Sequence, residues 1–238
     1  SGINLGSYGR DLGRRINFLG LVERMLAETG IPRIRVSSIE PMDVGRELIE
    51  LVAAEPRMAH HFHVPLQSGS NRILRLMNRR YWTTQYAERI LAIRERMPNC
   101  GIGADVMTGF PGETDADHAE SLRFIESLPY TYLHIFPYSV RPGTAAAARP
   151  EQVDGRRIHE RVRELRSLIA ARRGRFLHEQ IGRKLSVVVL HKIQGGAPTA
   201  LSTNYLQVSL PGSEPVPNTL VDVTIGRVHE GGLVGRPA

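Results

Sequence analysis

The chain has few of the features that mark an exported or membrane protein. It contains one cysteine, Cys100, in 238 residues, which excludes an internal disulfide framework and makes a reducing cytoplasm the expected compartment. No apolar run approaches the ~20 residues that cross a membrane, and the opening residues have neither the basic leader nor the apolar core of a signal peptide. With 41% hydrophobic residues, the composition predicts a folded protein with a real core.

Several common catalytic motifs are also absent. The chain has no glycine-rich phosphate loop with its lysine, no GxGxxG fingerprint, no Gly-x-Ser-x-Gly elbow and no cysteine cluster. His60, His61 and His63 lie close together, but no further ligand stands at a recognisable spacing. We therefore predict no metal site in this chain.

Positive charge is concentrated in one segment. The net charge is +7 and the isoelectric point is near 10.1, which favours a polyanionic partner, although an arginine-rich proteome has the same effect on any protein. Ten arginines stand against five acids between Arg149 and Arg183. This clustering favours a binding surface.

The most informative pattern is a repeated unit in which an apolar strand runs into a turn rich in glycine and hydroxyl groups and then into a helix. The clearest copies are His61–Ser70 and Gly103–Thr114. Such units form a parallel sheet, curved here like part of a barrel, with the turns at one end. We predict strands over residues 33–38, 62–66, 102–107 and 132–136, a strand fragment at 2–7, and helices over 14–29, from Asp43 to Val52, and over 71–77, 83–97 and 114–128.

The pattern changes after Pro150. Apolar residues at helical spacing from Ile158 to Phe176 predict one long amphipathic helix whose other faces carry arginines, Arg161 among them. After a boundary near residues 179–182, the apolar period becomes two. Short strands over 185–190, 205–210 and 220–225 predict a small antiparallel β-barrel of OB-like character, a scaffold that often binds RNA.

Polar side chains at the strand ends are the candidates for chemistry. The glycines of Gly109–Thr114 allow a ligand to approach the backbone, or serve only a tight turn. Gln67 and Ser68 offer amide and hydroxyl groups at another strand end, and Glu40 can accept from a ligand or pair with an arginine. Parallel strands bring these ends together, so we expect one shared pocket.

Five long segments carry the most distinctive motifs of the chain. They are GSYGRDLG (6–13), RIRVSSIEP (33–41), HFHVPLQSGSNRILRLMNRRY (61–81), GIGADVMTGFPGET (101–114) and YLHIFPYSVRPGTAAA (132–147). Together they resemble the radical-SAM methylthiotransferases, and nearly the whole chain is covered. The tRNA branch that acts on N6-threonylcarbamoyladenosine at position 37 is the most similar, and the C-terminal strands resemble the TRAM domain of that family, which binds tRNA.

The resemblance implies S-adenosylmethionine and two 4Fe–4S clusters. One cluster, held by Cys-x3-Cys-x2-Cys, cleaves S-adenosylmethionine to a radical that abstracts hydrogen from adenine C2. An auxiliary cluster delivers sulfur, and a second S-adenosylmethionine supplies the methyl group. In the family these cysteines precede GSYGRDLG, so Cys100 alone holds neither cluster. We expect the chain to be the C-terminal part of a longer enzyme, inactive as it stands and without catalytic residues of its own.

The motif positions also imply binding residues. Those expected to line the pocket for S-adenosylmethionine and substrate are Ser37, Glu40, Gln67, Ser68, Asp105, Thr108, Gly109 and Tyr138. Those expected to contact RNA are Arg183, Lys184, Lys192, Tyr205 and Arg227, by phosphate neutralisation or, for Tyr205, by stacking on a base unless it belongs to the core.

The expected organisation is a partial radical-SAM barrel (1–148), a basic connecting helix (149–180) and a TRAM-like β-barrel (181–238). The first functional hypothesis is part of a tRNA methylthiotransferase in the cytoplasm. The alternatives are a non-catalytic RNA-binding module and the sibling branch that modifies a ribosomal protein. The sulfur donor and the oligomeric state do not follow from the sequence.

Overall fold

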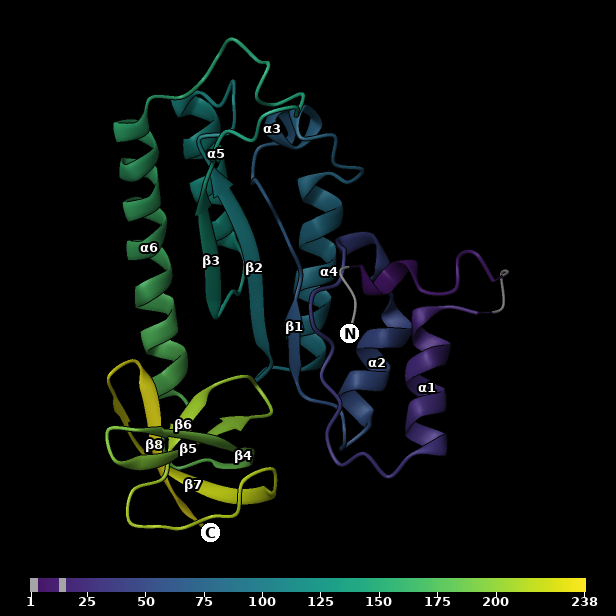
Figure 1. The fold of residues 1–238 in the computed structure, drawn as a ribbon, viewed down its shortest axis with the longest axis vertical. Helices are drawn as coiled ribbons and strands as arrows, with labels where there is room; N and C mark the ends of the chain where they lie inside the picture. The colour runs from purple at the N-terminus through teal and green to yellow at the C-terminus, as the bar shows by residue number, and fades with distance from the viewer. Residues whose placement is uncertain (1–3, 13–15) are drawn as a thin grey trace.

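A computed structural model describes residues 4–12 and 16–238, and it contains a parallel sheet joined to a closed β-barrel. The sheet has the strand order β1-β2-β3, with β1 at His61–His63, β2 at Gly101–Thr108 and β3 at Tyr132–Pro137. The barrel lies below the sheet in Figure 1, at the lower end of helix α6 (Gly155–His178). Among the described helices, none combines the length and hydrophobicity that a membrane crossing requires.

Helices alternate with the strands, as the repeated pattern predicts. α5 shows why the turn residues matter: the Thr114 side chain accepts a hydrogen bond from the Asp117 amide, and Asp117 accepts from the Thr114 amide, so the helix begins with a capping box. The other elements of this region are η1 (Leu5–Ser7), α1 (Phe18–Glu28), η2 (Pro41–Asp43), α2 (Arg46–Ala54), α3 (Asn71–Leu76), α4 (Thr83–Arg96) and α5 (Asp115–Ser127).

Several predicted elements need correction. The predicted cap of α2 at Asp43 is wrong, because Asp43 ends the short η2 turn and Gly45 precedes α2. Of the predicted strand fragment at 2–7, residues 5–7 form the 3-10 turn η1, and residues 2 and 3 lie outside the described residues. The first two residues of the predicted helix 14–29 also lie outside them, and α1 begins at Phe18.

The predicted strand over residues 33–38 is not continuous. It makes only two isolated parallel bridges, Ile34 with Met58 and Ser38 with His63. From Ile34 to Ser38 is four positions, whereas from Met58 to His63 is five, so the register slips by one residue between the two contacts. An extra residue of this kind interrupts a ladder, and the sheet therefore keeps three strands.

Helix α6 (Gly155–His178) runs alongside β3 and leads into the barrel (Figure 1). The barrel strands close in the order β4-β5-β6-β8-β7, which confirms the predicted small barrel. The prediction of a wholly antiparallel barrel is wrong, because β6 and β8 pair in parallel. The strands are β4 (Lys184–Gln194), β5 (Ala197–Ser202), β6 (Gln207–Ser209), β7 (Leu220–His229) and β8 (Gly232–Pro237). The sequence pattern missed β5 and β8, which are short and contain proline or glycine. Gly235 of β8 is needed because a Cβ there would lie 2.3 Å from Val223 Cγ1.

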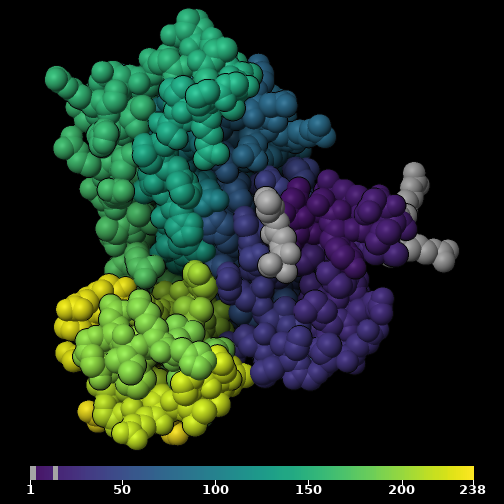
Figure 2. Space-filling model, viewed as in Figure 1, coloured from purple at the N-terminus to yellow at the C-terminus, as the bar shows by residue number. Residues whose placement is uncertain are grey.

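Each region has its own apolar core, and polar contacts join the two regions. One cluster lies between the sheet and its helices, and the other fills the barrel. Arg33 donates to Ser186 Oγ across the boundary (3.0 Å), and Gln180 donates to Asn99 Oδ1 (2.9 Å). Figure 2 shows the barrel in contact with the N-terminal part of the chain.

Candidate functional site

The two faces of the parallel sheet differ in chemistry. Side chains alternate along a strand, and Phe62 and Ile102 on one face are fully buried in the core that packs against the helices. The opposite face carries five polar side chains in contact with one another. We call this set the polar row: His61, His63, Asp105, Tyr132 and His134.

Hydrogen bonds connect the polar row across all three strands. The Tyr132 hydroxyl lies 2.8 Å from His61 Nε2 and 3.0 Å from His63 Nδ1. Asp105 Oδ1 lies 3.1 Å from His63 Nε2 and 3.3 Å from His134 Nδ1. Burial lowers the pKa of His61 to about 3, so this imidazole is neutral. The exposed fraction rises along the row from buried His61 to exposed His134.

Glycine makes room for this arrangement. A Cβ at Gly103 would lie 2.0 Å from Tyr132 Cζ, and one at Gly101 would lie 2.2 Å from the Asn204 carbonyl oxygen. The Tyr132 ring therefore lies over Gly103, and the turn before β6 lies over Gly101. The next residue in that turn is Tyr205, whose ring stands 4.4 Å from the His61 ring and beneath the Arg35 guanidinium at 4.6 Å.

Several residues predicted to line the cofactor pocket meet at one edge of the sheet. Gln67 pairs with Val106, and the Tyr138 amide donates to the Thr108 carbonyl at 2.8 Å. Gln67 adopts a positive φ of 65°, a conformation rare for a residue with a side chain. Within the described part of the chain, Thr108 Oγ1 and Tyr138 Oη are buried without a hydrogen-bond partner. Unpaired buried hydroxyls at this edge fit a polar ligand.

Other predicted pocket residues already have protein partners. Ser68 is buried, and its hydroxyl contacts Ser121 Oγ and the Ser70 amide. Glu40 faces Arg79 at 3.4 Å, the arginine pairing that the sequence left open. Ser38 forms an isolated parallel β-bridge with His63. Its neighbour Ser37 therefore lies at mid-sheet rather than at the strand ends. The eight residues therefore do not all share one pocket edge.

The turn after β2 is held from helix α6. Gly109 has a φ of +76°, and a Cβ there would lie 2.3 Å from Ile158 Cγ1. The Gly109 amide donates to Glu113 Oε2 at 2.5 Å, and Arg161 donates to the same oxygen at 2.7 Å. Burial raises the pKa of Glu113 despite the opposing Gly109 amide and Arg161 guanidinium. These contacts fix the turn conformation.

The predicted position of Arg161 on the outer faces of the helix is wrong. Arg161 is 3% exposed and pairs with Glu113 and Asp115. A signal for it was present, because position 161 follows Ile158 by three residues and precedes Leu165 by four, which places it on the apolar stripe.

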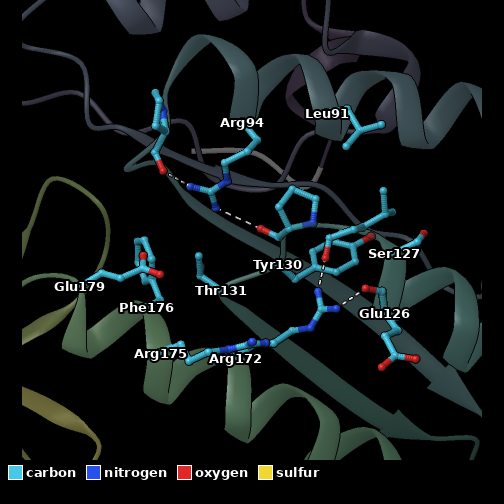
Figure 3. Close-up of a pocket in the computed structure, with 13 residues that line it drawn as sticks. Leu91, Arg94, Glu126, Ser127, Tyr130, Thr131, Arg172, Arg175, Phe176 and Glu179 are labelled. Carbon is cyan, nitrogen blue, oxygen red and sulfur yellow. Dashed lines mark hydrogen bonds between the residues drawn. The ribbon is translucent and has the colours of Figure 1, made fainter.

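Two open cavities lie away from the polar row. One of about 520 Å³ adjoins the turn after β2 and is lined by Arg72, Gly112 and Arg149 among others. The other, of about 490 Å³, lies between α4 and α6 (Figure 3). There, Arg94 donates to the Pro129 carbonyl at 3.0 Å, and Arg172 donates to the carbonyls of Glu126 and Leu128. None of the eight predicted pocket residues lines either cavity.

The predicted RNA-contacting residues divide into two groups. Arg183, Lys184 and Arg227 are exposed, and the backbone of Arg183 bonds to Ile225 in β7, so these cations lie near one end of the barrel. Lys192 lies further along β4, up to about 26 Å from Lys184 at the usual rise per strand residue. The Tyr205 ring packs against His61 and Arg35 at the boundary of the two regions. This packing does not support the prediction that Tyr205 stacks on a base, which stays untested.

Cys100 lies in the sheet core. It is fully buried, and burial raises the pKa of its thiol to about 12. A buried, protonated thiol does not fit an iron–sulfur cluster ligand.

Comparison with known proteins defines the class. The Radical SAM superfamily matches residues 7–125, and the chain belongs to this superfamily. Among solved structures, coproporphyrinogen III oxidase (HemN) from Escherichia coli, titled as a radical SAM enzyme, has a TM-score of 0.54 and 14% identity over 80% of this chain and 50% of its own. This likeness supports the fold alone.

The curated relatives are tRNA methylthiotransferases, which confirms the predicted family resemblance. A threonylcarbamoyladenosine tRNA methylthiotransferase MtaB from Aquifex aeolicus is 37% identical over 91% of this chain and 51% of its own length. A tRNA-2-methylthio-N(6)-dimethylallyladenosine synthase from Pelotomaculum thermopropionicum is 38% identical over 79% of this chain and 42% of its own length. The chain spans about half the length of the curated relatives it matches.

Proposed function

We propose that this chain is the radical-SAM and RNA-binding part of a cytoplasmic tRNA methylthiotransferase. Its substrate is C2 of N6-threonylcarbamoyladenosine at position 37 of tRNA. The observation that carries the proposal is the joining of a radical-SAM sheet to a closed β-barrel through α6, in a chain that matches an MtaB over 91% of its length. We propose that the chain divides into a partial radical-SAM barrel up to residue 148, a connecting helix up to residue 180, and the β-barrel as a TRAM-like domain after it.

The strand ends provide the contacts that S-adenosylmethionine needs. When bound at an iron–sulfur cluster, this cofactor supplies a 5′-deoxyadenosyl radical. The unpaired hydroxyls of Thr108 and Tyr138 can hydrogen-bond its polar atoms, and the turn at Gly109 allows close approach of the backbone. Arg161 and Glu113 keep this turn in place without contacting the ligand.

Cys100 does not fit either cluster, and the chain has no other cysteine. We assign the ligands of both 4Fe–4S clusters to sequence outside these 238 residues, in agreement with the coverage of the relatives. The part of the enzyme present here binds and orients S-adenosylmethionine and shields it from water. The sulfur-transferring step belongs to the complete protein.

The barrel supplies cations for RNA. Arg183 and Arg227 are exposed, while Lys184 is partly neutralised by Asp222 at 3.0 Å. Replacing Arg183 and Lys184 with glutamine removes up to two phosphate contacts, so the slope of log affinity against log salt should fall by up to about 2 units. Filter binding of tRNA at several salt concentrations measures this slope. A pair of replacements at Arg24 and Arg96, exposed arginines of the sheet region, is the charge-matched control, and an unchanged slope in the barrel variant would show that the RNA surface lies elsewhere.

Deletion of the gene tests the activity. Mass analysis of tRNA nucleosides should show loss of the methylthio group from N6-threonylcarbamoyladenosine, with the dimethylallyl nucleoside unchanged. Loss confined to the dimethylallyl nucleoside would assign the chain to the branch represented by the Pelotomaculum relative. Unchanged tRNA would contradict the proposal and favour the ribosomal-protein branch or a non-catalytic RNA-binding module.

A further inference from the structure

Three side chains of the polar row converge on one point. His63 from β1, Asp105 from β2 and His134 from β3 each present one ligand atom, and these three atoms all lie within 4.8 Å of one another. Asp105 Oδ1 is 3.1 Å from His63 Nε2 and 3.3 Å from His134 Nδ1. Sequence spacing could not reveal this set, because its members are separated by 42 and 29 residues and meet only through strand pairing.

Two of the three ligand-atom distances match the inner ligand shell of a transition metal, and the third, between the two imidazole nitrogens, is at most 4.8 Å. Bonds of about 2.1 Å to nitrogen and oxygen separate neighbouring ligand atoms by roughly 3.0–3.4 Å in tetrahedral or octahedral geometry. The two distances around Asp105 Oδ1 fall in this range. Two imidazoles and one carboxylate form a ligand set that Zn²⁺ and Fe²⁺ accept.

The site also has the outer contact that metal-binding histidines need. Nδ1 of His63 contacts the Tyr132 hydroxyl, which leaves Nε2 directed at Asp105. A hydrogen bond on the second ring nitrogen fixes the orientation of a metal-bound imidazole. Tyr132 is itself fixed, because its ring lies over Gly103 and its hydroxyl contacts His61.

The site is rigid on one side and open on the other. Asp105 and His134 are paired residues in the register of β2 and β3, so the backbone sets their separation. The side-chain exposure rises from 9% at His63 through 24% at Asp105 to 55% at His134. A metal held here would therefore keep positions open toward the polar face.

We propose that His63, Asp105 and His134 bind one divalent transition-metal ion, with Zn²⁺ as the reference ion, on the open face of the sheet. Tyr132 acts as the positioning residue. The open positions take water or an anionic ligand. The inference does not depend on the proposed tRNA substrate or on S-adenosylmethionine.

Metal titration of the 238-residue chain tests the proposal. The chain is stripped with a chelator, dialysed against Zn²⁺ and analysed for bound metal, and Co²⁺ is then used as a spectroscopic probe. We expect one equivalent of tightly bound metal and visible Co²⁺ bands that indicate nitrogen and oxygen ligands. Because Cys100 is buried, thiolate ligation does not complicate the result.

Variants locate the metal. His134→Ala removes an exposed ligand with little risk to folding, and Asp105→Asn keeps the side-chain shape. Each should weaken Zn²⁺ binding at least tenfold, and Tyr132→Phe should weaken it less. The controls His159→Ala and His191→Ala remove exposed histidines outside the row and should bind as the parent does.

Circular dichroism establishes that each variant is folded. The proposal is overturned if the parent chain binds no more Zn²⁺ than the His134→Ala variant does. It is also overturned if the Asp105→Asn and His134→Ala variants both bind Zn²⁺ with the affinity of the parent. In either case His63 and His134 only donate hydrogen bonds to Asp105, and the polar row is a hydrogen-bonded network without a metal.

Discussion

The two faces of the parallel sheet are built from the same strands and serve different purposes. Phe62 and Ile102 project into the helix-packed core, whereas their neighbours His61, His63 and Gly103 belong to the open face. The apolar face excludes water and holds the strands in register. The open face is therefore free to carry histidine, carboxylate and glycine at positions that contribute less to folding, and this is where polar chemistry can be placed.

The largest expected effect tests whether stability depends mainly on the helix-packed face. Phe62→Ala removes a fully buried ring and should lower the free energy of unfolding by about 3–5 kcal/mol, since it leaves a cavity in the core. Phe136→Ala is the matched control, because that ring stands on the opposite face and is 48% exposed. Urea denaturation measures both, and the control should lose less than about 1 kcal/mol. Equal losses would contradict the division of the two faces.

A smaller effect is expected where the open face is closely packed. Gly103→Ala places a methyl group 2.0 Å from the Tyr132 ring, which must move. We expect a loss of about 1–3 kcal/mol, together with longer distances from Tyr132 to the two histidines. Thermal and urea denaturation measure the loss, and changes in tyrosine near-ultraviolet circular dichroism report the ring.

Gly174→Ala is the control for this glycine substitution. Gly174 lies within α6, and a Cβ there meets no atom within 4 Å. Alanine should stabilise the helix by about 0.5–1 kcal/mol, the opposite sign to Gly103→Ala. If Gly103→Ala were also neutral or stabilising, the Tyr132 ring would not depend on this glycine, and the open face would be more loosely packed than the distances indicate.

Sequence periodicity was sufficient for most of the elements. The helix from Thr114, the long helix α6 and the strands β2 and β3 follow from apolar spacing and capping residues, because these signals are local. The strand at 33–38 was predicted but not formed, since a one-residue slip against the segment before His63 depends on a partner that local pattern does not specify. Strands β5 and β8 were missed because their proline, glycine and other small residues weaken the period-two signal.

The candidate site was predicted only in part. The strand ends at Gln67, Thr108 and Tyr138 do meet, because parallel topology requires it. Ser68 and Glu40 are engaged by protein groups, and no sequence pattern shows which hydroxyl or carboxylate finds a partner inside the fold. Of the polar row, Asp105 was predicted as a pocket residue and His61 and His63 were noted as neighbours, but Tyr132 and His134 were not singled out, because the members come from three strands.

The smallest effect concerns Cys100, the last residue before Gly101 and part of the helix-packed core. Burial raises the pKa of its thiol from 9.0 to about 12. In the unfolded chain the thiol loses its proton above about pH 9, whereas in the folded chain it keeps the proton. The unfolded state therefore binds fewer protons in this window, and stability must fall as pH rises from about 9 toward 12.

pH 10 lies one unit above the pKa of this thiol in the unfolded chain. The thiol should therefore lower the free energy of unfolding at pH 10 by about 1.4 kcal/mol relative to its value at pH 8 or below. Buried tyrosines add their own alkaline dependence, so the measurement is the difference between the parent chain and Cys100→Ala in urea denaturation at pH 8 and pH 10. The variant should lose less stability over this interval, although it is less stable at pH 8 because of the lost core volume. A parallel loss in both proteins, or rapid labelling of the native thiol at pH 8, would place Cys100 in contact with solvent. Cys100 would then not belong to the helix-packed core.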